Sequence, residues 1–350
     1  MAGARPALPE VRPTSLDVVR TTLPLVVPFA TATGTEVARQ VVLVRARDDD
    51  GHEGWGECGA LSQPGYTGEW VEGADAVLRR FLLPAALAGR RAQLPGHPMA
   101  SAAVEAAVLD VRLAAAGLEL PTWLGAVRDR VPAGVAVGIA PSVDALVAEV
   151  AHHVAAGYPR VKLKVRPGWD VEPARAVRTT WPDVPVGVDA NGSYRADDEA
   201  LGRLDGLGLV EIEQPLPADD LVGTAAVVRR LATPVCLDES VTSVGTLEAA
   251  LALGALDHLN LKPARVGGLT AALAVLDRAR DAGVPVWVGG MLATGVGKAV
   301  DVALAALPGV TLPGDLPASR RWFARDLTAP WELTADGTLP VRPRGPVTLP

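Results

Sequence analysis

The stretch Val161-Lys162-Leu163-Lys164-Val165 decides the fold of this chain. It is rich in β-branched residues and alternates apolar with basic side chains, which predicts a β-strand. Because successive side chains of a strand point to opposite faces, the three apolar residues share one face. Lys162 and Lys164 share the other face, roughly 7 Å apart along the strand. Two ammonium groups on one face repel each other, so we expect anionic groups opposite them.

Ionisable residues follow this strand at steps of 24 or 25 residues. Each stands at the end of a short apolar run or directly after it, and the four are Asp189, Glu213, Asp238 and Lys262. From about residue 132 onward, apolar runs alternate with helical patterns, as in a parallel sheet built from β/α repeats. Strands are predicted near 133–138, 160–165, 184–188, 209–213, 234–237, 257–261, 284–288 and 309–312. Helices are predicted over 143–156, 171–180, 197–204, 219–231, 244–253, 269–282 and 296–306.

Eight strands at this period predict a closed β/α barrel of the TIM-like kind. The main alternative is an open doubly wound sheet. Such sheets often carry a Gly-x-Gly-x-x-Gly loop after the first strand, and no such loop is found here. The sequence therefore favours the barrel.

The first 120 residues lack this rhythm and predict an antiparallel α+β unit. Strands are expected near 16–20, 40–47 and 55–58, and helices over 68–83, ended by Pro84, and over 99–116. The loops 24–34 and 60–68 are either plain surface loops or lids that carry specificity residues. We therefore expect a capping domain over 1–125, a barrel with the active site over 126–320, and a C-terminal segment over 321–350 that returns to the cap.

Composition excludes several classes of protein. The net charge is −7 and the chain has no basic tail, which argues against a nucleic-acid partner. No apolar run is long enough to span a bilayer, and the N-terminus lacks the apolar core of a signal peptide. The two cysteines, Cys58 and Cys236, argue against a disulfide framework. We expect a cytoplasmic protein without membrane contacts.

The strand ends of a barrel meet at one mouth, so the three carboxylates are expected to be neighbours there. An all-oxygen set without His or Cys favours a hard cation, Mg²⁺ above all, over zinc. Lys164 and Lys262 would flank this set from two sides. A lysine on either side could remove the proton α to a carboxylate, provided that its pKa falls well below about 10.4.

Several motifs resemble the enolase superfamily. Within it, the chain is similar to the o-succinylbenzoate synthase / N-succinylamino acid racemase family. The motifs are Lys162-x-Lys164, Asp189-Ala-Asn191, Glu213-Gln-Pro215, Asp238-Glu-Ser240, Asn260-Leu-Lys262 and Arg265-Val-Gly-Gly268. The resemblance extends over roughly residues 15–345 and implies an α+β capping domain on a modified (β/α)7β barrel.

The resemblance also implies a role for each site residue. Asp189, Glu213 and Asp238 would bind one Mg²⁺, for which Mn²⁺ can substitute. Lys164 would be the general base, and Lys262 would stabilise the enediolate or act as a second acid/base. The substrate, a small carboxylate, would be bound by Lys162, Asn191, Arg265, Gly290 and Met291.

The implied activity is o-succinylbenzoate synthase, a lyase that removes an α-proton and then water in menaquinone synthesis. The alternative is N-succinylamino acid racemase, or an enzyme with both activities. We also expect a homo-oligomer. Two positions depart from the family pattern, Ala136 where a serine is common and Ala293 where an acidic residue is common, and we expect both to bear on which substrate is bound.

Three further hypotheses remain. A dipeptide epimerase would carry Asp-x-Asp at the last strand, which this chain lacks. A Schiff-base aldolase would use Lys164 or Lys262 covalently but would leave the three carboxylates unexplained. A catalytically inactive barrel that serves as a binding module would have no need of lysines on both flanks.

Overall fold

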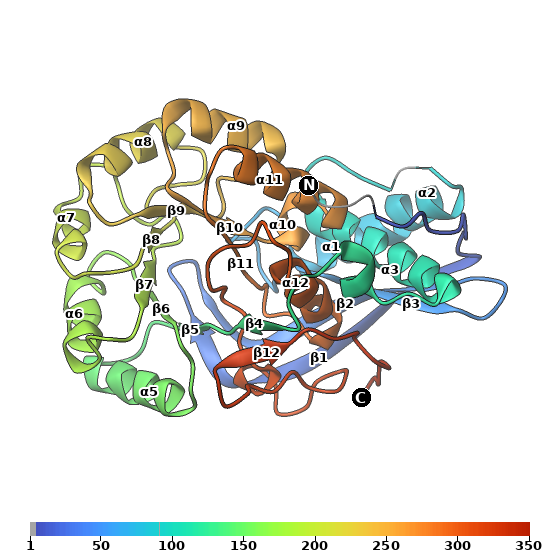
Figure 1. Ribbon diagram of the computed structural model, residues 1–350, viewed down its shortest axis with the longest axis horizontal. Coiled ribbons are helices and arrows are strands. Elements are labelled where there is room, and N and C mark those ends of the chain that lie inside the picture. The colour runs from blue at the N-terminus through green and yellow to red at the C-terminus, as the bar shows by residue number, and fades with distance from the viewer. Residues whose placement is uncertain (1–4, 91) are drawn as a thin grey trace.

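The computed structural model describes residues 5–90 and 92–350. Its first part is an antiparallel sheet in the order β1-β2-β3, covered by helices on one face (Figure 1). The strands are β1 (Ser15–Ala30), β2 (Thr35–Arg47) and β3 (Glu53–Cys58). The helices are α1 (Val71–Val77), the π-helix η1 (Leu78–Leu82), α2 (Leu83–Leu87), α3 (Pro98–Ala116) and α4 (Leu120–Leu124). This confirms the predicted antiparallel α+β unit.

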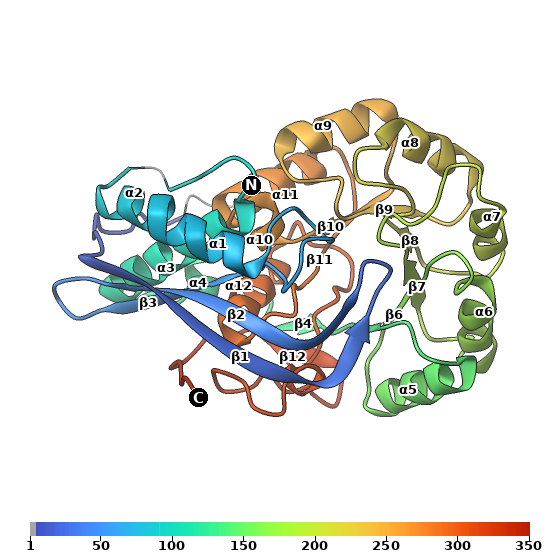
Figure 2. The ribbon, with the colours of Figure 1, turned by 180° about the vertical axis from the view of Figure 1, so that it is seen from behind.

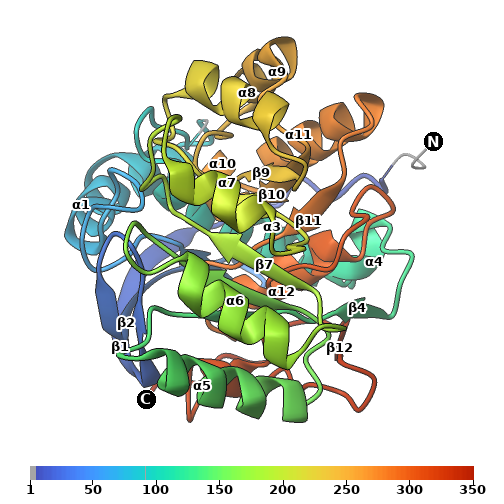
Figure 3. The same cartoon turned by 90° about the vertical axis from the view of Figure 1, so that its left-hand side faces the viewer.

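The second part is a curved sheet of seven parallel strands in the order β11-β10-β9-β8-β7-β6-β5. The strands are β5 (Val135–Val137), β6 (Val161–Lys164), β7 (Val186–Asp189), β8 (Ile212–Glu213), β9 (Val235–Leu237), β10 (His258–Leu261) and β11 (Val286–Val288). Helices alternate with these strands along the chain. They are α5 (Val143–Ala155), α6 (Val171–Thr180), α7 (Glu199–Asp205), α8 (Leu221–Arg230), α9 (Val244–Leu253), α11 (Leu269–Asp281) and α12 (Gly295–Ala305). Figure 3 shows several of these helices as an outer layer. The prediction of a modified TIM-like barrel is confirmed.

The strand predicted over 309–312 is wrong. This segment lies along β11, where Thr311 and Leu312 donate backbone hydrogen bonds to Val286, but it forms no strand. Pro313 has no N–H to continue a ladder, and a single parallel bridge joins Gly289 to Asp315.

The barrel closes between this segment and β5. A Cβ atom on Gly134 would clash with the backbone oxygen of Gly314. The segments around these two glycines therefore approach each other more closely than any other residue at position 134 would allow. Arg321 adds a hydrogen bond to the backbone oxygen of Ala136 at 3.0 Å. Contacts of this kind replace the eighth strand.

The predicted loop 24–34 is mostly strand. β1 continues to Ala30 and pairs with β2, with a shift of register between Pro24 and Phe29. Leu25 and Phe29 are buried in an apolar cluster together with Trp322, so packing of the strand overrides its prolines. Figure 2 shows the tip of this hairpin reaching toward the barrel.

Pro84 does not end the helix predicted over 68–83. The helix continues as α2 to Leu87, and the π-helix η1 lies directly before it. Proline in a helix removes one hydrogen bond and its ring crowds the preceding turn. A wider π turn just before Pro84 accommodates that ring, which explains why the chain stays helical.

Three apolar clusters hold the parts together. One fills the barrel and the layer under its helices, and it includes Val161 and Leu163 of β6. A second joins α3 to the cap sheet. The short strand β12 (Thr338–Pro340) pairs with β4 (Arg130–Pro132), and Arg344 beyond it bonds Asp110 of α3 at 2.7 Å. Within the described residues, no helix combines the length and apolarity needed to cross a membrane.

Candidate active site

The strand register brings the predicted site residues together at one end of the barrel. Lys164 lies opposite Asp189 in the pairing of β6 with β7, and Asp189 lies opposite Glu213 in the pairing of β7 with β8. Asp238 follows β9 directly, and Lys262 follows β10 directly. Because the C-terminal ends of parallel strands meet at the barrel mouth, the five side chains converge there, and all five are buried.

Each carboxylate of the predicted metal triad contacts a lysine. The three carboxylates are completely buried, so an unpaired charge on any of them would be unfavourable. The Nζ–oxygen distances are 2.6 Å for Lys164–Asp189, 2.7 Å for Lys162–Glu213 and 2.7 Å for Lys262–Asp238. Lysine ammonium groups therefore balance the charge of this carboxylate set.

Burial and neighbouring charges set the pKa values of two of the carboxylates. Burial raises the pKa of Asp189, but Lys164 and Lys162 outweigh it and hold the pKa below its ordinary value. Burial, joined by the charge of Asp189, raises the pKa of Glu213. The two carboxylates thus repel each other across β7 and β8, and a cation between them would relieve that repulsion.

For two of the lysines, neighbouring anionic groups raise the pKa. Burial lowers the pKa of Lys262, but Tyr66 and Glu213 outweigh it and raise the pKa above its ordinary value. Anionic groups likewise hold the pKa of Lys162 well above its ordinary value, although burial lowers it. The ammonium group of Lys162 also lowers the pKa of Lys262, but the surrounding anionic groups outweigh it.

Asn191 connects the two sides of the mouth. Its Oδ1 accepts a hydrogen bond from Lys164 Nζ at 2.9 Å, and its Nδ2 donates to Glu239 Oε1 at 2.9 Å. Its φ is +44°, in the left-handed region that asparagine tolerates better than most residues. This backbone conformation turns the side chain back toward Lys164 and fixes the direction of the ammonium group.

Arg265 lies behind the triad rather than on the wall of the cavity. It is fully buried, pairs with Asp238, and donates to the backbone oxygen of Asn260 at 2.7 Å. The structure therefore brings it next to the predicted metal ligands and away from the space where a substrate would lie.

Three further residues contact the predicted set, although sequence analysis gave them no role. Tyr66, from the loop 60–68, accepts a hydrogen bond from Lys262 Nζ at 2.9 Å. Asp315 lies 2.9 Å from Lys162 Nζ, and Asn260 Nδ2 donates to Glu213 Oε1 at 2.6 Å. Asn260 stands in one of the motifs that carry the resemblance, so that motif was a usable signal. The packing of a distant loop places Tyr66, and no spacing in the sequence predicts it.

A front cavity of about 190 Å³ opens over these residues, between the barrel mouth and the cap. Phe29 and Thr31 from the β1–β2 hairpin and Tyr66 from the loop 60–68 form its outer wall. The predicted residues that line it are Lys162, Lys164, Lys262, Asn191, Gly290 and Met291, and the two departures Ala136 and Ala293 line it as well. Both cap segments thus cover the site, as lids would.

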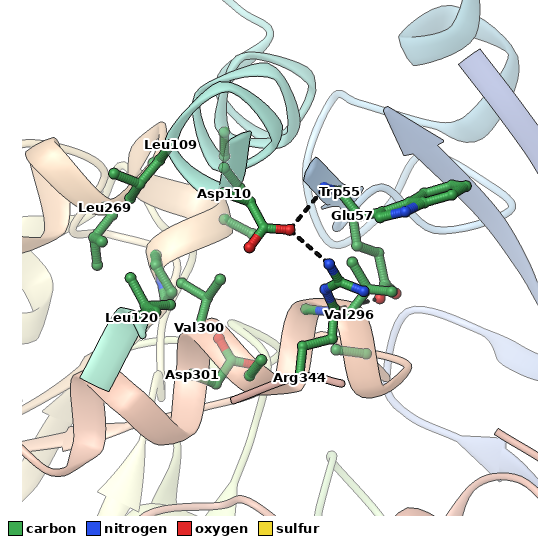
Figure 4. Close-up of a pocket in the computed structure, with 18 of the residues that line it drawn as sticks. Trp55, Glu57, Leu109, Asp110, Leu120, Leu269, Val296, Val300, Asp301 and Arg344 are labelled. Carbon is green, nitrogen blue, oxygen red and sulfur yellow. Dashed lines mark hydrogen bonds and ion pairs between the residues drawn. The ribbon is translucent and has the colours of Figure 1, made fainter. Parts of the chain in front are cut away.

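A rear cavity of about 230 Å³ lies between α3, α4, α11 and α12 (Figure 4). Leu109, Leu120, Leu269 and Val300 give it a mainly apolar wall. Figure 4 shows the pair of Arg344 with Asp110 at one side of this space. The two cavities meet at the residues that line both of them, which are Lys262, Met291, Ala293 and Asp301.

One compact group of possible metal ligands lies elsewhere. The ligand atoms of Asp48, Asp50 and His52, in the β2–β3 turn, lie within 4.8 Å of one another. Asp48 is already used by the turn, because it accepts hydrogen bonds from the backbone N–H groups of Asp50 and His52. Among the described residues, the predicted triad is not gathered as tightly, since each of its carboxylates is drawn to a lysine.

Comparison with known proteins agrees with this architecture. Residues 145–346 match the family described as enolase C-terminal domain-like. The chain belongs to the enolase superfamily. It is 46% identical over 343 residues to N-succinylamino acid racemase from an Amycolatopsis species, covering 95% of this chain and 92% of that protein. It is 43% identical over 314 residues to o-succinylbenzoate synthase from Geobacillus kaustophilus, covering 87% and 84%.

Solved structures of the enolase superfamily agree as well. A member from Listeria innocua Clip11262 superposes with a TM-score of 0.87 at 36% identity, covering 95% of this chain and 92% of that one. Enzymes of the superfamily use a divalent metal ion, typically Mg²⁺. The carboxylates of this chain fit such an ion, because they are three oxygen donors on neighbouring strands and two of them repel each other.

Proposed function

We propose that this enolase-superfamily protein removes the proton α to the carboxylate of a small substrate. Two buried lysines on opposite flanks of a buried carboxylate set carry this proposal. Lys164 ends β6 and Lys262 follows β10, and the strands β7 to β9 with the three carboxylates lie between them. A substrate above the carboxylates would therefore have one ammonium group on each side.

The proposed roles follow from these positions. Asp189, Glu213 and Asp238 would hold one Mg²⁺, which when bound supplies positive charge that acidifies the α-proton and lowers the pKa of the nearby lysines. Lys164 would take the α-proton, with Asn191 fixing its direction. The cap segments that cover the cavity would exclude water from the reacting carbon.

The activity we propose first is o-succinylbenzoate synthase, in which Lys164 removes the α-proton and then assists the loss of water on the same face. Similarity to the synthase of Geobacillus kaustophilus supports this activity. In this reaction Lys262 would not accept a proton. Its ammonium group would instead stabilise the enediolate from the opposite flank. The pathway we propose is menaquinone synthesis.

N-succinylamino acid racemase activity is the second candidate. Racemisation needs an acid/base on each side of the α-carbon, and Lys262 stands opposite Lys164 as that reaction requires. Similarity to the racemase of the Amycolatopsis species also supports it. The same residues can serve both reactions, because both begin with removal of the α-proton.

Turnover of the cyclohexadiene carboxylate precursor, measured with and without Mg²⁺, tests the proposal. Racemisation of an N-succinylamino acid is measured in parallel, and the Lys164→Ala protein is included in both assays. We expect metal-dependent dehydration that the variant loses. Racemisation alone would support the second candidate, whereas turnover that persists in the variant would contradict the role of Lys164. The exposed residue Arg195, replaced by alanine, is the matched control.

A further inference from the structure

Three of the four lysines of this chain belong to the site described above, where Lys164 and Lys262 flank the carboxylates and Lys162 pairs with Glu213. The sequence contains only four lysines among its 33 basic residues, and the fourth is Lys298. All four line the front cavity. Lys298 is 3% exposed, and its Nζ donates one hydrogen bond, to the backbone oxygen of Pro317 at 2.7 Å. An ammonium group has three hydrogens to donate, so Lys298 keeps donors for a ligand.

Asp301 stands one turn further along α12 and has no partner. Its side chain is 7% exposed, and no hydrogen bond or ion pair within 4.0 Å involves it among the described residues. A Cβ atom on Gly290 would lie 3.7 Å from Asp301 Oδ2, so this carboxylate faces the end of β11, on the wall of the front cavity. A carboxylate that faces a cavity without a partner is free to accept a hydrogen bond, which points to a ligand that donates one to it.

Neighbouring groups do not fill this role. Glu57 lies close to Asp301, but it accepts hydrogen bonds from Thr294 and from the backbone N–H of Gly297 and has nothing to donate. Lys298 is at i−3 on the same helix, yet no ion pair joins it to Asp301. The wall of the front cavity therefore presents a hydrogen-bond donor, the ammonium group of Lys298, and next to it an acceptor, the carboxylate of Asp301.

A donor next to an acceptor matches an amide group. The carbonyl oxygen of an amide accepts from an ammonium group, and its N–H donates to a carboxylate. A free carboxylate at the same place would meet the like charge of Asp301. Lys298 lines the front cavity alone, whereas Asp301 lines both cavities, so the nitrogen side of the amide would face the rear cavity.

The rear cavity can take an apolar substituent on that nitrogen. Its volume of about 230 Å³ exceeds the roughly 150 Å³ of an apolar cavity that binds benzene. Ala293, at the boundary, has a small side chain. We propose that Lys298 and Asp301 recognise a distal amide of the substrate and that the rear cavity receives the apolar group on its nitrogen. This inference rests on the proposed α-proton removal and concerns the racemase candidate.

The binding of three ligands that differ only in their terminal group tests the inference. They are N-succinyl-L-alanine, its terminal primary amide and its terminal N-benzyl amide. Calorimetry uses the Mg²⁺-loaded Lys164→Met variant, so that binding is measured without turnover. We work at about pH 8.5, where a carboxyl group with a pKa of about 7, the value to which burial raises Asp301, is ionised. We expect the primary amide to bind at least tenfold more tightly than the carboxylate, and the benzyl amide more tightly still.

Two further substitutions, made in the Lys164→Met background, separate the parts of the site. Asp301→Asn removes the negative charge and adds a donor beside the remaining acceptor, so it should reduce or abolish the preference for the primary amide over the carboxylate. Val300→Phe narrows the rear cavity and should weaken the benzyl amide alone, because Val300 lines only that cavity. Tighter binding of the carboxylate, or no change with Asp301→Asn, would overturn the amide site. A benzyl amide that is unaffected by Val300→Phe would overturn the role of the rear cavity.

A second measurement distinguishes failure of the amide site from failure of the proposed function. Exchange of the α-proton with D₂O by the enzyme with Lys164 intact shows whether the proposed reaction occurs with any of the three ligands. If no exchange occurs, the proposed function fails, while the order of the dissociation constants still decides whether the amide site exists.

Discussion

The hydroxyl group of Tyr66 donates a hydrogen bond to Asp238 Oδ1 at 3.0 Å, although 172 residues separate them. The hydroxyl oxygen of Tyr66 accepts hydrogen bonds from Lys262 Nζ at 2.9 Å and from Arg265 Nη1 at 3.2 Å. One cap residue therefore joins a predicted metal ligand to a predicted catalytic lysine. The cap is a part of the site and not only its cover.

Replacing Tyr66 by phenylalanine removes these hydrogen bonds and keeps the ring that packs over Lys262. Hydrogen bonds to charged groups contribute about 1.5–3 kcal/mol. We expect kcat/KM to fall at least about tenfold, with most of the change in KM, because the loop 60–68 loses its attachment over the substrate. Steady-state kinetics with the substrate of the proposed reaction measure this. Tyr194→Phe, whose hydroxyl bonds Asp170 outside the cavity, is the control and should leave KM unchanged.

The two lysines should act on opposite faces of the substrate. In D₂O, each enantiomer of an N-succinylamino acid exchanges its α-proton through the lysine on its own side. We expect Lys164→Met to abolish exchange of one enantiomer and Lys262→Met to abolish exchange of the other, each by about 10²–10⁴-fold. NMR of the α-proton follows each reaction. Equal loss for both enantiomers in both variants would contradict the assignment of one face of the substrate to each lysine.

Sequence spacing predicted the barrel residues of the site because the fold repeats. A β/α unit of 24 or 25 residues returns the chain to the same edge of the sheet, so Lys164, Asp189 and Glu213 had to come into register. The position of Tyr66 could not be predicted in this way. It depends on how the cap packs against the barrel, and packing between domains leaves no period in the sequence.

The errors in secondary structure have similar causes. The segment 309–312 has the composition of a strand, but it lies between Gly309 and Pro313 and cannot continue a ladder. In the hairpin, Pro24 and Pro28 suggested a loop, yet burial of Leu25 and Phe29 keeps β1 extended. In the first case a flanking proline decides the outcome, and in the second a contact distant in sequence overrides the local propensity.

Metal binding should be visible in stability as well as in activity. A ligand that binds only the folded state at about 100 times its Kd stabilises that state by roughly 2.7 kcal/mol. We therefore expect Mg²⁺ to raise the Tm by several degrees, and Glu213→Gln to remove most of this increase because it deletes one negative ligand. Asp48→Asn, in the turn with the compact acidic group, should keep the full increase. Loss of the increase in Asp48→Asn instead would place the ion in that turn.

Glu69 gives a prediction about pH. Its carboxylate accepts hydrogen bonds from the backbone N–H groups of Met99 and Ala100 at the start of α3, at 2.7 and 3.1 Å. Burial nevertheless raises the pKa of Glu69 from 4.5 to about 7. The folded protein thus holds this proton up to about pH 7, whereas the unfolded chain releases it near pH 4.5. Between these values the folded state binds more protons, so stability falls as the pH rises.

Glu69→Gln keeps an acceptor for α3 but carries no charge, so this part of the pH dependence should disappear. We expect the Tm of the wild-type protein to fall between about pH 5 and pH 8, and the Tm of Glu69→Gln to fall less over the same range. Thermal unfolding followed by circular dichroism measures both. Glu72→Gln, an exposed position on α1, should keep the wild-type slope. A slope that is equal in all three proteins would show that Glu69 is ionised throughout this range and that the hydrogen bonds from α3 outweigh its burial.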